Sequence, residues 1–341
     1  MKNYNKKRPS VQEIANEISI SASTVSRTLN NHPKISQKTK EIVWEAAKKL
    51  GYQPNIPAYM NPDKAKTICF MVPDLNAPFY KDAINSIQKF YLKKEYNLYI
   101  AFTNNSIEIE KMYTSSLVDL NVKGVIVALF DKSSDSNHLN QLLNQNIPTV
   151  FINKTNHTPD SCKIIPDISY GAYKAINHLI SMKCQNIAVF TGDLNNPYYA
   201  DIIDGYEDAL AESDYKINKE YIFSNTISQK KVYKKLEELL KQNKLPDAIL
   251  TPSTQVANQV INWMTMHNLS APKDILLVSF SNDKNYTISA STLSTVQFSG
   301  SEIGHKAAEK LFQQIKKGKI IDETVIVPPK FIIKSTSLKL K

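Results

Sequence analysis

The stretch from Ser21 to Asn31, SASTVSRTLNN, concentrates hydroxyl side chains and one arginine in a segment with helical sequence on both sides. Serine and threonine are mediocre helix formers because their hydroxyls compete for backbone hydrogen bonds, so another requirement must favour them here. Short hydroxyl side chains allow close approach to a DNA backbone and donate to phosphate oxygens, and Arg27 is able to make a bidentate contact with guanine. The stretch therefore predicts a DNA-contacting helix, with a merely solvated helix as the alternative.

Three short helices are expected to position this stretch, because apolar residues recur at helical spacing between residues 11 and 51. The first helix ends near Ile18, and Ser36 can cap the third. Val25 and Leu29 are expected to fasten the second helix to the core, which leaves its polar residues on the outer face.

The corner between the first two helices consists of only Ser19 and Ile20. So short a link forces a sharp turn and predicts a helix-turn-helix. Such a corner commonly takes a glycine with positive φ, so the serine at position 19 is expected to cost about 1 kcal/mol.

Positive charge is concentrated at the N-terminus. The chain carries a net charge of +10, and residues 1–66 hold 12 Lys and Arg against 5 Asp and Glu. A small basic module is typical of a protein with a polyanionic partner, and a solvated basic surface is the alternative. Charge alone does not separate DNA from RNA or from a membrane.

Little in the sequence suits catalysis. The six histidines show no metal-ligand spacing, and there is no phosphate loop, GxGxxG or GxSxG motif, so we expect no enzyme activity, no metal and no cofactor. Three cysteines far apart suggest a reducing cytoplasm. No apolar segment follows MKNYNKKRPS and no run is long enough to span a bilayer, so a cytoplasmic protein without membrane insertion is expected.

The pattern changes after a stretch with three prolines, QPNIPAYMNPDKAKT. From Lys66 on, apolar strands alternate with amphipathic helices in two similar sets, followed by a helix from Glu302 to Lys316 and two more strands. Such βαβ repetition predicts parallel sheets with helices on both faces, and two similar sets imply two lobes with a cleft between them. Ligands in such architectures bind at the carboxyl ends of the strands.

Several motifs in a fixed order extend these predictions. They read IANEISISASTVSRTLN, KISQKTKEIVWEAAKKLGYQPN, NAPFY, GAYKAINHLI with NIAVFTG, DGYEDAL, DILLVSFSN and LSTV. In this order the chain resembles the lactose/galactose repressor (LacI/GalR) family of bacterial transcription regulators over nearly its whole length. The resemblance implies an α/β fold in which an all-α helix-turn-helix domain precedes a two-lobed domain like a periplasmic binding protein, with parallel sheets.

The resemblance also implies the domain bounds and the partners. The expected bounds are 1–53 for the DNA-binding domain, 54–66 for the hinge and 67–341 for the body, with an N-lobe of about 67–166 and 298–323 and a C-lobe of about 167–297 and 324–341. Members bind a near-palindromic double-stranded DNA operator as a homodimer and hold a small-molecule effector, often related to carbohydrates, in the interlobe cleft. A dimer is expected here because the tail lacks an apolar heptad segment.

Specific residues take roles by the same resemblance. The base-reading positions are Ala22, Ser23 and Arg27. The phosphate-contacting positions are Ser21, Thr24, Ser26, Asn30, Ser36 and Thr39. Because the first two base-reading side chains are small, Arg27 is expected to carry much of the direct readout.

The hinge departs from the family pattern. Relatives form a hinge helix on DNA that inserts a leucine into the minor groove, and the corresponding position here is Asn61, close to Met60 and Ala58. Pro62 stops any helix immediately. Either Met60 takes over the wedge, or kinking at the operator centre is weaker.

The cleft departs as well. Relatives that bind sugars or purines place an arginine three residues before the glycine of DGY, where this chain has Ile202. Such an arginine is a charged hydrogen-bonding group that suits a polyol or a carboxylate. Its absence makes a simple sugar a weaker expectation for the effector. The candidate cleft positions are Asn76, Phe79, Asn153, Asn195, Tyr198, Ile202, Ser253, Ser281 and Asn282. A packed or solvent-filled cleft is the alternative.

The leading hypothesis is a homodimeric, effector-modulated transcriptional repressor. One alternative is a constitutive DNA-binding regulator with a degenerate cleft. Another is a small-molecule binding protein, against which the helix-turn-helix argues. The sequence leaves open whether the effector releases or strengthens DNA binding.

Overall fold

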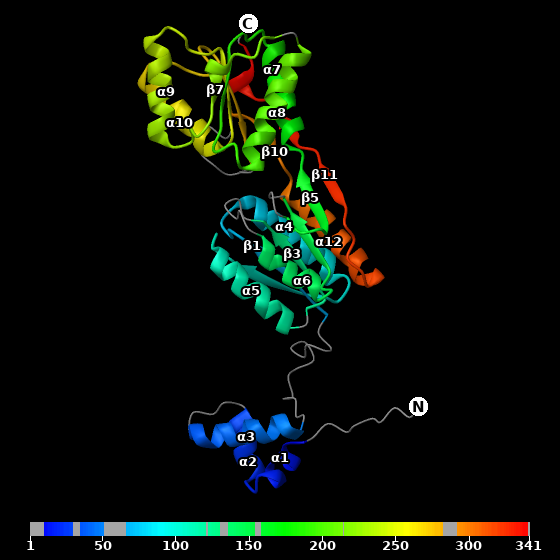
Figure 1. The fold of residues 1–341 in the computed structure, drawn as a ribbon. Helices are drawn as coiled ribbons and strands as arrows, with labels where there is room; N and C mark the ends of the chain where they lie inside the picture. The colour runs from blue at the N-terminus through cyan, green and yellow to red at the C-terminus, as the bar shows by residue number, and fades with distance from the viewer. Residues whose placement is uncertain are drawn as a thin grey trace. The chain divides into compact units, whose positions relative to one another are not determined.

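The computed structural model describes residues 10–29, 35–50, 66–120, 122–129, 136–153, 158–213, 215–281 and 292–339. The chain divides into two compact units, Met1–Ala65 and Lys66–Lys341. The described residues of the two units form separate hydrophobic cores. Figure 1 draws the helices and strands of each unit.

The first unit contains the three predicted helices. They are α1 (Val11–Glu17), α2 (Ala22–Leu29) and α3 (Gln37–Leu50). A capping box formed by Ser10 and Glu13 begins α1 and satisfies two backbone N–H groups reciprocally. The fully buried Val25 joins residues of α1 and α3 in one core, and Leu29 packs against that core partly buried. Both anchoring predictions are confirmed.

The corner between α1 and α2 holds Ser19 in the left-handed region, at φ 52°. A serine pays a steric penalty there because its Cβ approaches the backbone, as the short link predicted. We expect Ser19→Gly to stabilise the first unit by about 1 kcal/mol, less the extra entropy that glycine gains in the unfolded chain. Thermal unfolding of the first unit followed by circular dichroism measures this. A melting temperature that falls in the glycine variant would contradict it, and Gln12→Gly on α1, which is exposed, is the control expected to destabilise.

The first lobe of the second unit is built on a six-stranded, wholly parallel sheet. In spatial order its strands are β11 (Thr324–Val327), β5 (Cys162–Pro166), β4 (Thr149–Ile152), β3 (Gly124–Ala128), β1 (Thr67–Val72) and β2 (Asn97–Phe102). Its helices are α4 (Pro78–Leu92), α5 (Ile107–Asp119), η1 (Asn137–Leu139), α6 (Asn140–Asn144) and α12 (Gly300–Lys317). Successive residues of β3 point into different cores, Ile126 toward α4 and α12, and Val125 toward α5 and α6, so helices cover both faces.

The second lobe repeats this plan. The spatial order of its strands is β12 (Lys330–Ile332), β10 (Ser294–Gln297), β9 (Leu276–Phe280), β8 (Ala248–Thr251), β6 (Ile187–Phe190) and β7 (Ile222–Phe223). Among the described strands of this sheet, β12 alone is antiparallel to its neighbour. The helices are α7 (Ile168–Ser181), α8 (Pro197–Glu212), η2 (Lys219–Tyr221), α9 (Gln229–Lys241), α10 (Thr254–Met266) and η3 (Ser335–Ser337). The core contacts put α7 and α8 on one face and α9 and α10 on the other.

One predicted lobe boundary is wrong. The bounds expected from the resemblance place everything from residue 324 in the C-lobe, but β11 pairs in parallel with β5 and extends the first sheet. The chain returns to the second sheet only with β12. Figure 1 shows β11 running beside β5, although more than 150 residues separate them in the sequence. The residue pattern of an edge strand does not show which of two sheets it joins, because that depends on the strand with which it pairs.

Candidate nucleic-acid interface and interlobe cavity

α2 has one face fixed to the core and one polar face. The side chains of Val25 and Thr28 are fully buried. Arg27 lies about 200° around the helix from Val25, since each residue advances about 100°. It is exposed, as is Ser23. The predicted base-reading position Ala22 is half-buried and packs partly against the core, so it offers less surface than the other two.

Matching hydroxyl pairs begin α2 and α3. The backbone N–H of Thr24 donates to Ser21 Oγ at 3.2 Å, and the two side-chain oxygens lie 2.8 Å apart. Ser36 and Thr39 repeat the arrangement at the start of α3, with the same two distances. The prediction that Ser36 caps the third helix is confirmed. Two helix N-termini therefore expose hydroxyls beside backbone N–H groups, an arrangement suited to phosphate.

Other predicted contact residues differ in their accessibility. Ser26 is half-buried on α2. Asn30 and the hinge positions Ala58, Met60 and Asn61 lie outside the described residues, as does the cleft candidate Asn282.

A cavity of about 590 Å³ lies between the two lobes of the second unit. It is bordered by residues that directly follow strands: Asp74 shortly after β1, Asn153 after β4, Pro252 after β8 and Ser281 after β9. The carboxyl ends of both sheets therefore face one space, where ligands of open α/β sheets bind.

Six aromatic side chains line this cavity. They are Phe79 and Tyr80 of α4, Tyr198 and Tyr199 of α8, Phe280 at the end of β9, and Phe298. Tyr198 stands edge-on to Tyr199 and Phe280, with ring centroids 5.2 and 6.1 Å away. Phe280 in turn stacks on Phe298 at 6.3 Å and 15°. The second lobe thus contributes a continuous wall of rings.

Hydrogen bonds fix much of the polar lining. The hydroxyl of Tyr198 donates to the carbonyl of Pro252 at 2.7 Å, and Thr254 Oγ1 donates to Ser281 Oγ at 2.7 Å. Ser253 caps α10 by accepting from the N–H of Val256. The lining therefore combines rings with positioned oxygens, as small-molecule sites do.

Comparison with known families decides what this architecture is. A model of the periplasmic binding proteins and sugar binding domain of the LacI family matches residues 65–335, and a model of the bacterial regulatory proteins of the lacI family matches residues 10–55. The chain belongs to the LacI family. It is a DNA-binding transcriptional regulator, and the prediction of family and fold class is confirmed.

Relatives of this LacI-family chain are transcriptional regulators. The repressor PurR of Glaesserella parasuis serovar 5 (strain SH0165) is 27% identical over 308 residues, covering 90% of each chain. Catabolite control protein A of Priestia megaterium is 26% identical, covering 94% of this chain and 96% of that one. The lac repressor dimer bound to operator and the anti-inducer ONPF has the same fold, with a TM-score of 0.69, 20% identity and coverage of 98% and 100%.

Five of the nine predicted cleft residues of this LacI-family protein line the cavity. They are Phe79, Asn153, Tyr198, Ser253 and Ser281. Three others do not. Asn76 and Asn195 are exposed residues of the loops leading into α4 and α8, and each binds the carboxylate of an aspartate two positions earlier. Ile202 is fully buried in the core, so its assignment to the cleft is wrong.

The sequence reasoning missed both carboxylates of the cavity, Asp74 and Asp201. Helical spacing offered a signal for the second, because position 201 lies three residues after Tyr198 and shares its side of α8. The apolar Ile202 next to it then belongs to the core. The family's arginine position corresponds to Ile202, so the prediction named Ile202 and not Asp201.

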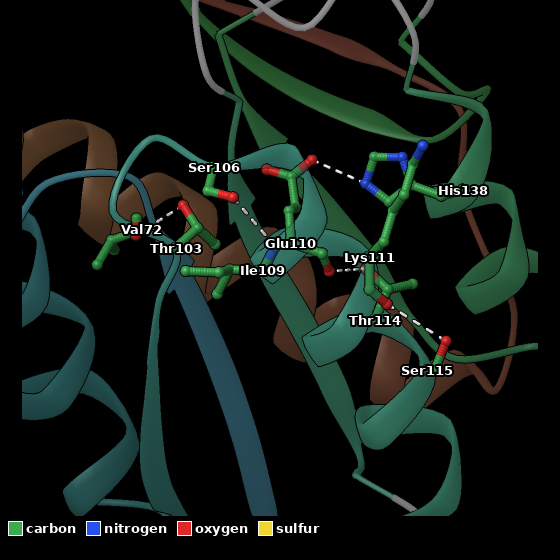
Figure 2. A network of polar contacts seen from close by, with 9 residues as sticks. All are labelled: Val72, Thr103, Ser106, Ile109, Glu110, Lys111, Thr114, Ser115 and His138. Atoms are coloured by element: carbon green, nitrogen blue, oxygen red, sulfur yellow. Dashed lines mark hydrogen bonds and ion pairs between the residues drawn. The ribbon is translucent and has the colours of Figure 1, made fainter.

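A buried polar pair lies in the first lobe, away from the cavity. Figure 2 shows His138 beside Glu110 of α5, with 2.8 Å between Nε2 and Oε1. Their side chains are only 9% and 3% exposed. Within the described residues no group of three potential metal ligands occurs, so this pair does not extend to a metal site. We interpret the contact between His138 and Glu110 as a structural hydrogen bond that joins η1 to α5.

The three cysteines are free thiols in the core. Burial raises the pKa of Cys69 and Cys162 to about 12 and that of Cys184 to about 11. Thiols that resist deprotonation are poor nucleophiles and poor metal ligands. No helix within the described ranges is long and apolar enough to cross a membrane.

Proposed function

We propose that this chain is a repressor that binds a near-palindromic DNA operator as a homodimer, with one α2 helix in the major groove at each half-site. A small-molecule effector in the interlobe cavity modulates the binding. The similarity to the repressor PurR supports repression, and the similar lac repressor structure is a dimer on its operator.

The observation that carries this proposal is the two-sided character of α2. Val25 fixes one side in the core, while Arg27 and Ser23 stand exposed on the opposite side. Base contacts require side chains that reach the groove edge from a rigid support, and a buried anchor two residues away provides that support.

Phosphate contacts set the register of this helix on DNA. The hydroxyls of Ser21, Thr24, Ser36 and Thr39 lie at two helix N-termini, where a phosphate replaces the hydroxyl partners that now bond each other. Ser26 and Asn30 complete the proposed set.

The hinge is proposed to act in a shifted form. Met60 is the apolar side chain nearest to the family's wedge position, and Asn61 is polar. An apolar wedge is what unstacking a base step requires, so Met60, flanked by Ala58, takes this role.

Arg27→Ala is expected to weaken specific operator binding by about 1 to 3 kcal/mol and to relax the base preference at one position of each half-site. The reason is that no other exposed residue of α2 can bond a guanine at two points. Fluorescence anisotropy on a site identified by genome-wide footprinting measures the loss, with a scrambled duplex to give the non-specific affinity.

Lys49→Ala is the matched control, because it removes one exposed positive charge of the same unit from α3, where Lys49 pairs with Glu17 at 3.0 Å. This variant is expected to retain the base preference. Specific affinity unchanged by Arg27→Ala, or lost equally on both duplexes, would remove Arg27 from the base-reading role.

A further inference from the structure

Ser23 carries an exposed hydroxyl on the side of α2 that also carries Arg27. The two residues are four positions apart, so they lie on the same side of the helix. A serine hydroxyl has one hydrogen to donate and two lone pairs with which to accept, and it rotates, so by itself it can bond any of the four bases in the major groove. Ser23 therefore selects between bases only if its hydrogen is committed to another partner.

The side chain of Ser23 has one hydrogen-bond partner among the described residues, the hydroxyl of Ser21. The two Oγ atoms lie 2.9 Å apart. The same Ser21 oxygen accepts the backbone N–H of Thr24 at 3.2 Å and lies 2.8 Å from Thr24 Oγ1. An oxygen with one hydrogen and two lone pairs is saturated by these three contacts. Because the N–H group occupies one lone pair, Ser21 donates in one of its two hydroxyl contacts and accepts in the other.

A phosphate in the proposed complex decides the direction of these bonds. Phosphate oxygens only accept, so Ser21 donates its single hydrogen to the phosphate in place of its contact with Thr24 Oγ1. The Ser21 oxygen then serves two donors, the N–H group of Thr24 and the hydroxyl of Ser23. The hydrogen of Ser23 therefore points to Ser21, and the lone pairs of Ser23 face the bases.

We propose that Ser23 reads an exocyclic amino group, so that the base it contacts in each half-site is adenine or cytosine, and that Ser21 is the positioning residue that imposes this preference. This inference rests on the proposed function, since it names the class of base recognised by one residue of the same interface. Adenine N6 and cytosine N4 offer donors at the major-groove edge. Guanine O6 and thymine O4 are acceptors and would face the lone pairs of Ser23.

Anisotropy measurements on the full chain test this reading, with a duplex identified by footprinting and all four base pairs at each half-site position. At one position of each half-site, adenine or cytosine is expected to bind about fivefold more tightly than guanine or thymine, the effect of one neutral hydrogen bond. Ser23→Ala should abolish this preference at that position alone. Purine in place of adenine, or 2-pyrimidinone in place of cytosine, removes only the amino group and should weaken binding by a similar factor in the unmodified protein but not in Ser23→Ala.

Ser21→Gly tests the positioning role, because it removes the acceptor of the Ser23 hydrogen, and glycine begins a helix nearly as well as serine does. Affinity should fall on every duplex, since a phosphate contact is lost. The amino preference should shrink to less than about twofold, since Ser23 then rotates and donates as readily as it accepts. Ser21→Thr keeps the hydroxyl and should retain the preference.

Ser36→Gly is the matched control. Ser36 makes the same pair with Thr39 at the start of α3, at the same two distances, but the residue two positions after it is Lys38, which has no hydroxyl. This variant also loses a proposed phosphate contact at a helix N-terminus. It should weaken binding to all duplexes alike and leave the amino preference unchanged.

Three outcomes overturn the proposal: the position that responds to Ser23→Ala prefers guanine or thymine, no position responds to Ser23→Ala, or the amino preference survives Ser21→Gly. The response to Arg27→Ala separates this inference from the proposed function. If specific binding depends on Arg27 and the expected effects at Ser23 are absent, only the reading of an amino group is wrong. If the unmodified protein binds no duplex more tightly than a scrambled one, the proposed function itself fails.

Discussion

Val25→Asp is expected to abolish specific DNA binding and to leave the two-lobed body folded. Val25 is fully buried in a core shared by α1, α2 and α3, and a carboxylate there would be desolvated without a partner. A unit of this size has only a few kcal/mol of stability to lose, so the helix-turn-helix unfolds. Operator affinity should fall by about a thousandfold or more, to the non-specific level or below.

The body should not respond, because all residues in contact with Val25 in this core belong to the first unit. Calorimetry is expected to show an unchanged melting transition for the second unit, with the first transition lost. Ile42→Asp is the matched control: it adds the same charge on α3 at a side chain that is 46% exposed. It measures the electrostatic part of the loss separately. A Val25→Asp protein that still recognises its operator would show that α2 is not held by this core.

Gly205→Ala is expected to lower the free energy of unfolding of the body by about 3 kcal/mol, at the upper end of the usual effect of overpacking. A Cβ at this position of α8 would lie 2.0 Å from the carbonyl oxygen of Ser169 and 2.9 Å from the backbone nitrogen of Tyr173. These are backbone atoms of α7 that no side-chain rotation can move away, so the two helices must separate. The close packing of α7 and α8 is what the glycine permits.

Chemical denaturation followed by tryptophan fluorescence measures this effect. In a Trp44→Phe background the only remaining tryptophan is Trp263, which is fully buried in the second lobe and reports its unfolding. Asp204→Ala, one position earlier and exposed, is the control and should change stability by no more than about 0.5 kcal/mol. Because α8 also carries Tyr198 and Asp201, the glycine variant should bind cavity ligands more weakly. An unchanged unfolding midpoint would mean that α7 and α8 are packed less closely than described.

Local signals were enough for the first unit. The apolar spacing of its three helices and the two-residue corner limit the chain to one compact arrangement, and the left-handed Ser19 follows from the length of that corner. The hydroxyl pairs at the starts of α2 and α3 were also within reach, because helix caps depend on residues only three positions apart.

The cavity was harder to predict, because its lining comes from loops and helix starts of both lobes. Position-by-position transfer from the family placed Ile202 in the cleft, although the side chain is in the core and its neighbour Asp201 lines the cavity. Neighbouring residues on a helix point about 100° apart around its axis. A small rotation of α8 relative to the family's helix therefore decides whether Asp201 or Ile202 faces the cavity.

The sequence by itself determined the family, the helix-turn-helix with its anchored polar helix, and two largely parallel sheets, because each of these depends on local periodicity and on motifs in a fixed order. The tertiary structure alone decided that β11 joins the first sheet and that Asp74 and Asp201 reach the same cavity. The physical reason is that strand pairing and cavity walls join residues more than a hundred positions apart. Their proximity depends on how the elements pack, and no local pattern records it.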